Sequence, residues 1–323
     1  MTNVYGHMIG DCIRWLWFLQ TDEYRRFKKE GVKLLCISLD PLKNWQKEIF
    51  SLAGVEEEVI RVTEPVIVKR LIVPTPSLTT TEEQNYYRKE YVDTINLMIT
   101  NALSRGSGKR YATKLFLSRS GWKNEKSDLS ISQMLHKQGY QIVYPHKMSV
   151  TEQICMLQQV EVLASTEGNI SHNALFLRDG TKMEIFRKTL HVNKYSLFIN
   201  ELKHLDAIYI DCSLSIWTNR ENWWCGPFFL YINKAVADYY GIEKPRFPIR
   251  KFKKYVWNKA LRKNDIAFIL QNIDGQYADI LQSELVDIRQ RNKKIVDSLC
   301  RIFPILKRKY KGIYNTLNRL SIR

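Results

Sequence analysis

The stretch Lys114-Leu-Phe-Leu-Ser-Arg119 predicts a buried β-strand that ends in a hydroxyl and a guanidinium. In open α/β sheets the carboxyl ends of the strands face the ligand crevice. Ser118 and Arg119 are therefore candidates for a binding site, and the planar fork of Arg119 suits a diphosphate better than a lysine ammonium would. A surface arginine that merely follows a strand is the equally supported alternative.

Helices and strands alternate on both sides of this stretch. Downstream, the hydrophobic pattern predicts helices at residues 129–138, 150–159, 169–177 and 194–203, and strands at residues 141–144, 161–164, 182–186 and 207–210. Upstream, it predicts helices at residues 10–20, 45–53 and 82–103, and strands at residues 33–39, 59–62 and 66–73. Such alternation is typical of doubly wound α/β domains.

The polar segment 104–110 is the predicted domain boundary. We expect one Rossmann-like domain at residues 1–105 and a second at residues 106–215, with the two facing a cleft. Residues 216–323 are predicted to form a helical C-terminal region that carries several tryptophans, Trp217, Trp223 and Trp224 among them. The predicted fold class is therefore α/β.

Composition narrows the possible partners and the cellular compartment. The chain has 323 residues, of which 45% are hydrophobic, and 50 Lys and Arg against 33 Asp and Glu give a net charge of +17. Such a surface attracts anions such as nucleotides, phospholipid head groups, acidic glycans and nucleic acid. The six cysteines form no CxxC pair, which favours reduced thiols. We find neither a secretory signal nor an apolar run of spanning length and expect a cytoplasmic protein.

His7 and Asp11 lie four residues apart in a segment with helical character. At this spacing they share one helix face. A carboxylate beside an imidazole can deprotonate an acceptor hydroxyl if its surroundings raise its basicity or the histidine relays the proton. A capping or packing pair is the more common reason for this spacing.

A second candidate site follows the strand near residue 164, where Glu167-Gly168-Asn169 leads through Asn173 into a predicted helix. Backbone N–H groups in such a turn, aided by the helix dipole, can bind a pyrophosphate. An ordinary capped turn is the commoner explanation. Glu184, in the following strand, is a candidate for ribose binding, with an ion pair at a strand edge as its alternative.

The spacing of the residues argues against a P-loop and against a metal site. Residues 106–109, Gly-Ser-Gly-Lys, lack both the spacing and the final Ser or Thr of a P-loop and precede a strand. The histidines form no HxxxH or HExxH pattern. We therefore expect no protein-bound metal.

The tail at residues 299–323 combines basic and apolar side chains and contains no acid. This pattern is typical of a helix that lies on an anionic membrane. A basic helix packed on another domain is the alternative, because Pro304 and Gly312 interrupt the pattern.

Over most of residues 3–186 the order of these motifs resembles glycosyltransferase family 61, in its bacterial capsule-type branch. The matching positions are Asn3, Tyr5, His7, Asp11, Ile72-Val-Pro74, Ser118-Arg119, Val143-Tyr144-Pro145, Ser149, Glu152-Gln153, Gly168, Asn173, Phe176, Gly180-Thr-Lys182 and Glu184. One departure is Glu167-Gly168-Asn169, where the family usually has a histidine before the glycine.

The resemblance implies a GT-B fold and an inverting transfer that needs no metal, from a nucleotide sugar held mainly by the second domain. Asp11 becomes the expected base, assisted by His7. Arg119 and the Gly168 turn would stabilise the leaving diphosphate, with Tyr144 and Pro145 beside the nucleotide base. The expected acceptor is a saccharide or lipid-linked saccharide of capsule, lipopolysaccharide or exopolysaccharide synthesis, at the inner face of the cytoplasmic membrane.

The rival hypothesis is a non-enzymatic protein that binds a polyanion, either RNA or an acidic glycan. The charge of +17 together with 17 tyrosines and 8 tryptophans would allow it. No signature of an RNA-binding module supports it, and we expect no nucleic-acid partner.

Overall fold

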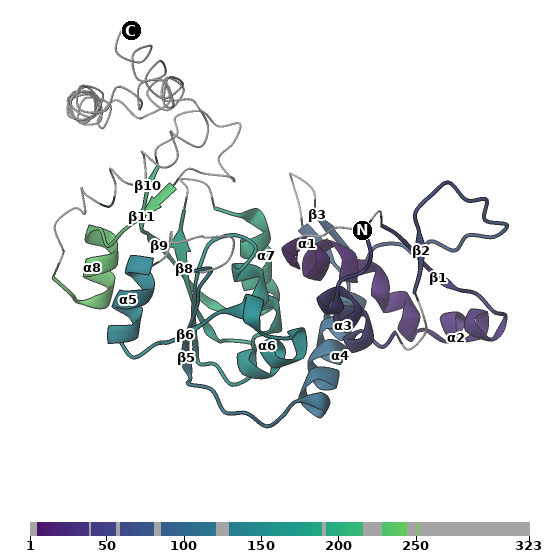
Figure 1. Cartoon of the computed structure of the whole chain (residues 1–323), viewed down its shortest axis with the longest axis horizontal. Helices are drawn as coiled ribbons and strands as arrows, with labels where there is room; N and C mark the ends of the chain where they lie inside the picture. Colours follow the sequence, from purple (N-terminus) through teal and green to yellow (C-terminus); the bar gives the residue numbers. More distant parts are fainter. Residues whose placement is uncertain are drawn as a thin grey trace, which may run out of the picture. The chain divides into compact units, whose positions relative to one another are not determined.

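The structure is a computed structural model (Figure 1), and it describes residues 5–38, 40–55, 59–80, 85–120, 129–188, 192–215, 228–243 and 251. The chain divides into two compact units. One comprises Met1–Leu214 and Leu230–Phe247, and the other comprises Ser215–Phe229 and Pro248–Arg323. Nearly all described residues belong to the first unit. Asn3, the three tryptophans named above and the basic tail lie outside the described residues, so the predictions made for them stay predictions.

A five-stranded parallel sheet forms the larger part of the described fold. Its strands are β5 (Lys114–Leu117), β6 (Gln141–Val143), β7 (Val162–Thr166), β8 (Lys182–Arg187) and β9 (Asp206–Asp211). They lie in the order β6-β5-β7-β8-β9, and every neighbouring pair is parallel. All five strands were predicted from the sequence, and the α/β class is confirmed.

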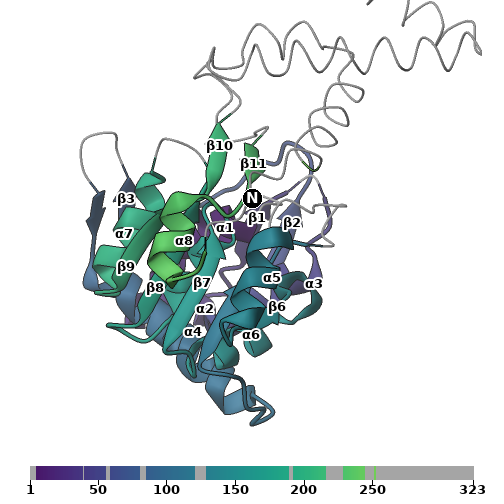
Figure 2. The same ribbon diagram turned by 90° about the vertical axis from the view of Figure 1, so that its left-hand side faces the viewer.

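Helices cover both faces of this sheet (Figure 1). One face carries α6 (Val150–Leu157), the 3-10 helix η4 (Ser171–Phe176) and α7 (Lys194–Leu202), and their apolar side chains share one core with strand residues such as Leu163 and Ile185. The other face carries α5 (Leu129–Lys137) and α8 (Lys234–Tyr240), which lie in front of the strands in Figure 2. On that face the Phe186 ring stacks on Tyr240 at 6.3 Å between centroids.

The N-terminal part of the chain contains smaller sheets. Strands β1 (Leu34–Ile37) and β2 (Val59–Val62) pair in parallel, with α3 (Asn44–Leu52) between them in the chain. Strands β3 (Leu78–Thr80) and β4 (Asn85–Tyr87) form an antiparallel hairpin that leads into α4 (Lys89–Arg105). A full second doubly wound domain is not confirmed, and the predicted domain boundaries stay predictions.

Two expectations for this part are wrong. The predicted strand at residues 66–73 is irregular chain, and most of its apolar side chains are exposed. Prolines bracket it, and no strand among the described residues pairs with it, so its β-favouring composition does not lead to pairing. The predicted helix from residue 82 begins only at Lys89, because residues 85–87 form β4. Tyr87 lies in β4 and packs on Phe198, with 5.6 Å between the ring centroids, so it contributes to the core from outside the helix.

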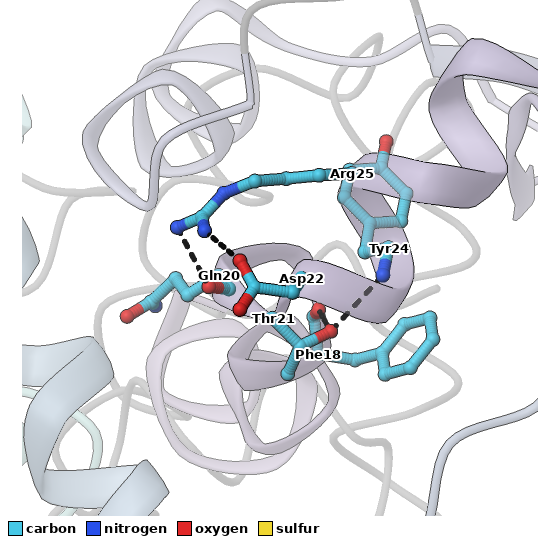
Figure 3. A network of polar contacts seen from close by, with 6 residues as sticks. All are labelled: Phe18, Gln20, Thr21, Asp22, Tyr24 and Arg25. Carbon is cyan, nitrogen blue, oxygen red and sulfur yellow. Dashed lines mark hydrogen bonds and ion pairs between the residues drawn. The ribbon is translucent and has the colours of Figure 1, made fainter.

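Helix α2 (Asp22–Lys29) was not predicted from the sequence. Thr21 caps it, since its Oγ1 accepts a hydrogen bond from the Tyr24 N–H at 3.1 Å and donates to the Phe18 carbonyl at 2.7 Å (Figure 3). Arg25 closes the same turn through an ion pair with Asp22 and a hydrogen bond to the Gln20 carbonyl. Such a cap can nucleate a short helix in a sequence of low hydrophobicity.

Contacts between α3 and α6 join the N-terminal part to the large sheet. The Glu48 carboxylate accepts hydrogen bonds from the Val150 and Thr151 N–H groups at 2.9 and 2.8 Å. A carboxylate at a helix N-terminus satisfies donors that have no partner within the helix. Within the described part of the chain, no helix has the length and hydropathy of a membrane span.

Candidate active site

The carboxyl ends of β5, β6 and β7 lie side by side, because Leu117 is in register with both Val143 and Ser165. The chain runs from β5 to β6 on one side of β5 and then to β7 on the other side. This reversal is the topological switch point, where open α/β sheets bind ligands. The structure therefore brings together the loops that carry most of the predicted donor residues, namely Ser118, Arg119, Tyr144, Pro145, Glu167 and Gly168.

The loop after β5 is built on Ser118. This residue is fully buried, its N–H donates to the Val143 carbonyl at 2.8 Å, and its Oγ accepts a hydrogen bond from the Ser120 N–H at 3.0 Å. These bonds hold the start of the loop against β6 and place the half-buried Arg119 at the edge of the sheet. Tyr144 and Pro145 occupy the neighbouring position after β6, where Pro145 begins a short 3-10 helix.

The turn after β7 depends on a glycine conformation. Gly168 has φ of 111°, which side-chain-bearing residues rarely adopt. Its carbonyl accepts bonds from both the N–H and the Oγ of Ser171, at 2.8 and 2.7 Å. The helix that follows has only six residues, so the expected contribution of a helix dipole is small.

Glu167 holds the turn after β7 to the beginning of α7. Its Oε1 accepts a hydrogen bond from the Asn193 N–H at 2.7 Å, and Asn193 in turn caps α7 through its own side chain. Burial raises the pKa of the Glu167 carboxyl, an effect that the backbone hydrogen bonds partly offset. A donor contact of Glu167 stays a prediction, while its bond to Asn193 is a structural contact.

His7 and Asp11 lie on an irregular helical segment. It consists of α1 (Tyr5–His7), a π-helical turn (Met8–Cys12) and a 3-10 helix (Ile13–Gln20). The His7 Nδ1 lies 2.7 Å from the Asp11 Oδ2, and the two side chains are 59% and 43% exposed. The two side chains therefore pair on one face, as their spacing predicts, and the pair is open to solvent. Its catalytic role stays a prediction. π-helical turns occur frequently at functional sites.

Two glycines allow this segment to approach the η4 region closely. A Cβ atom at Gly6 would lie 2.8 Å from the His172 Nδ1 and 2.9 Å from the Asn169 Oδ1. A Cβ atom at Gly10 would lie 2.5 Å from the Tyr195 hydroxyl oxygen. Both positions therefore have no room for a side chain. The segment that carries His7 and Asp11 is thus packed directly beside the turn at Gly168.

Asn173 adds a polar contact across the same interface. Its Oδ1 accepts a hydrogen bond from the Tyr5 hydroxyl at 3.2 Å, and its Nδ2 donates to the Ile170 carbonyl at 3.0 Å. The side chain is almost completely buried. Asn169 and Asn173, both predicted to contact the donor, lie at the interface with the N-terminal segment; the donor contacts themselves stay predictions.

A buried aromatic layer lies behind the His7–Asp11 pair. The His172 ring is 4.8 Å from the Tyr195 ring, and the Tyr195 hydroxyl is 3.1 Å from that of Tyr91. Burial lowers the pKa of His172 to about 4, so that it is neutral at pH 7, and the Gly6 backbone partly offsets this effect. Burial raises the pKa of Tyr195, and the negative charge of Asp11 adds to the increase.

His172 was not predicted as a site residue, because the histidines show no pattern of metal ligands in the sequence. Its position within Ser171-His172-Asn173, immediately after the glycine turn, was the available signal. Neither of its ring nitrogens makes a hydrogen bond of standard geometry with a described residue.

Glu184 lies in a different environment from the other predicted donor residues. It is the third residue of β8, and it is in register with Ala164, before the end of β7. Its carboxylate accepts hydrogen bonds from three phenols, at 2.7 Å from Tyr140, 2.8 Å from Tyr239 and 2.6 Å from Tyr240. The residue is 2% exposed. Its ribose contact stays a prediction, and sequence analysis missed all three tyrosines.

The described residues include no group of three or more His, Cys, Asp or Glu side chains that could hold a metal ion. Four of the six cysteines are described. All four are thiols outside any disulfide, with Cys36 and Cys212 buried and Cys12 and Cys155 partly buried.

Comparison with known proteins identifies a family. The profile of the family described as Glycosyltransferase 61 matches residues 5–183, which is more than half of the chain. No curated protein and no solved structure shows a significant match. The matched residues include the His7–Asp11 pair, the loops after β5, β6 and β7, and the beginning of β8.

Proposed function

The chain belongs to glycosyltransferase family 61, and from this premise we propose an inverting, metal-independent transfer from a nucleotide sugar. Membership implies a sugar donor and an acceptor as substrates. The proposed acceptor is a saccharide or lipid-linked saccharide of a bacterial surface polysaccharide. The proposed place of work is the inner face of the cytoplasmic membrane, where the basic tail would contribute to attachment.

In the proposed reaction Asp11 removes the proton of the acceptor hydroxyl while His7 orients the carboxylate. The hydroxyl oxygen then attacks the anomeric carbon, and the bond from this carbon to the diphosphate oxygen breaks on the opposite face. The diphosphate leaves with the electron pair. Arg119 and the backbone at Gly168 stabilise its negative charge, the task that a divalent ion performs in metal-dependent transferases.

One observation carries this proposal. The accessible His7–Asp11 pair, at 2.7 Å, is packed through Gly6 beside the turn that follows β7 at the switch point of the sheet. A base and a candidate diphosphate site thereby lie next to each other, as direct displacement requires. The residues of both come from segments that are more than 150 positions apart in the chain.

The direct test is release of nucleoside diphosphate from a panel of nucleotide sugars by the full chain, with and without saccharide acceptors. Thermal-shift screening against the same panel would first identify the donor. We expect release in the presence of a chelator. Activity that stops on chelation and returns with magnesium or manganese would contradict the metal-independent mechanism. Binding of RNA or an acidic glycan without any release would instead support the polyanion-binding alternative.

The donor site has a separate test. Arg119→Ala should weaken binding of the nucleoside diphosphate by about 2 kcal/mol, roughly thirtyfold, through loss of a charge-assisted contact. Arg110→Ala, which removes an exposed arginine just before β5, is the matched control and should bind normally. Normal binding by Arg119→Ala, measured calorimetrically, would remove this residue from the donor site.

A further inference from the structure

An exposed apolar loop connects β2 to the β3–β4 hairpin. Residues 65–74, called here the 65–74 loop, read Pro-Val-Ile-Val-Lys-Arg-Leu-Ile-Val-Pro. Five of their apolar side chains are exposed, at 54% for Val66, 101% for Ile67, 41% for Val68, 65% for Leu71 and 67% for Val73. Soluble proteins rarely expose so many apolar side chains in one place, and such patches mark sites of protein or membrane contact.

Specific contacts anchor this loop. The Arg70 guanidinium lies 5.0 Å from the Phe27 ring centroid, and its Nη1 is 3.5 Å from the Glu30 Oε2, so Arg70 ties the loop to the α2 region. At the far end the Trp17 Nε1 donates to the Thr75 carbonyl at 2.9 Å. These contacts hold the loop in place while its apolar side chains remain exposed.

The charge around the loop is mainly positive. Residues 65–74 contain Lys69 and Arg70 and no acid. The neighbouring helix α2 has four exposed basic residues, Arg25, Arg26, Lys28 and Lys29. The acids nearby are Asp22, Glu23 and Glu30 in the α2 region and Glu64 just before the loop, so the positive charges are in excess. Apolar side chains that protrude among lysines and arginines suit the interface of an anionic bilayer, where the side chains enter the acyl boundary and the cations meet lipid phosphates.

A second copy of the chain fits this surface less well. A symmetric contact would place the same patch against itself. Lys69 and Arg70 of one copy would then face those of the other, and like charges brought together oppose association. An anionic lipid surface has the opposite charge and needs no complementary shape.

The loop is also connected to the candidate catalytic segment. Just beyond it, the N–H and the Oγ of Ser77 both donate to the Arg14 carbonyl, at 2.9 and 2.8 Å. Arg14 follows Asp11 by three residues. A loop held on lipid would thus hold the His7–Asp11 segment close to the same surface.

We propose that the 65–74 loop inserts its apolar side chains into an anionic membrane surface and presents the His7–Asp11 pair to a lipid-linked acceptor. Contact with lipid at this loop is separate from any contact made by the basic tail. The part concerning the acceptor rests on the proposed function. The test measures lipid contact and not transfer, so either idea can fail alone.

The first experiment is co-sedimentation of the full chain with vesicles of phosphatidylglycerol and phosphatidylcholine, compared with phosphatidylcholine alone. Ile67→Asp should weaken binding to the anionic vesicles by about tenfold or more, since it removes a large inserted side chain and adds a repelled charge. Leu103→Asp, at a side chain that is 51% exposed on α4, is the matched control and should bind like the parent chain. Equal binding by Ile67→Asp and the parent would overturn the proposal.

The second experiment identifies the occupant directly and separates loop contact from tail contact. A photo-reactive benzophenone amino acid at position 67 should form a lipid adduct with the anionic vesicles, and the same group at position 103 should not. Both side chains are exposed, so the folded state should tolerate the change, which thermal unfolding would verify. Adducts with a second copy of the chain, or sedimentation without a lipid adduct at position 67, would show that the loop does not contact lipid.

Discussion

Asp11 and Glu184 carry the same chemical group in opposite surroundings. The Asp11 side chain is 43% exposed, and its hydrogen-bond partner His7 lies four residues before it. The Glu184 side chain is 3% exposed, and it accepts bonds from three tyrosines, of which the nearest in sequence is 44 positions away. A carboxylate that is open on one side can accept a substrate proton, whereas one surrounded by phenol donors contributes to stability.

The strongest test of this contrast is Asp11→Asn. It should reduce kcat/KM by about a hundredfold to ten-thousandfold, because an amide cannot accept the proton, while binding of the nucleoside diphosphate persists. The matched control is Asp22→Asn, at an exposed carboxylate in α2, which should keep full activity. Turnover close to that of the parent chain would remove Asp11 from the mechanism.

The buried histidine behind the pair should make stability depend on pH. The pKa of His172 is about 4 in the folded chain against an ordinary 6.5. Between these values the unfolded chain binds a proton that the folded chain does not. Protonation of this group should therefore lower the free energy of unfolding by roughly 3 kcal/mol as the pH drops from 6.5 to 4.

Denaturant unfolding at several pH values would measure this effect. The comparison is with His172→Leu, whose free energy of unfolding should change much less over the same pH range. The relevant quantity is the slope with pH, so that a generally weaker variant is still informative. Equal slopes for the two chains would show that His172 is not the buried group responsible.

Glu184→Gln should lower stability without abolishing transfer. An amide offers fewer acceptor sites to the three phenols, and a cost of about 2 kcal/mol follows from the loss of charge-assisted bonds in a buried network. Glu161→Gln, at an exposed glutamate before β7, is the matched control for unfolding. A selective loss of nucleotide-sugar affinity by a fully folded Glu184→Gln chain would instead support the predicted ribose contact.

The smallest expected effect is that of His7→Ala. The base itself remains in this variant, and only its orienting partner is lost, so a fall in kcat of about tenfold is expected. His136→Ala, at an exposed imidazole in α5, is the matched control and should keep the kcat of the parent chain. A loss as large as that of Asp11→Asn would indicate that His7 itself takes part in proton transfer.

The sequence was informative wherever a signal is local. The apolar runs at residues 115–117 and 162–164 predicted strands there, because a parallel strand buried on both faces is continuously hydrophobic. The same kind of run at residues 66–73 predicted a strand that does not form. Composition alone cannot tell whether a neighbouring strand is available for pairing.

Part of the candidate site could likewise be predicted from local signals, and part could not. The pairing of His7 with Asp11 follows from their four-residue spacing, and the gathering of Ser118, Arg119 and Gly168 follows from the rule that binding loops come after parallel strands. The rest of the site, including His172 beside Gly6 and Tyr195 beside Gly10, was not predictable. Those partners are more than 160 positions apart in the chain.

By itself, then, the sequence determined the strands and most helices of the large sheet, the loops that follow those strands, and the His7–Asp11 pair. These depend on hydrophobic periodicity and on spacings within one helix or strand, which a short segment carries alone. The tertiary structure decided which carboxylate is enclosed, as Glu184 is by Tyr140, Tyr239 and Tyr240, and which remains open, as Asp11 does. Enclosure requires side chains from distant segments, and only the folded path of the chain brings them together.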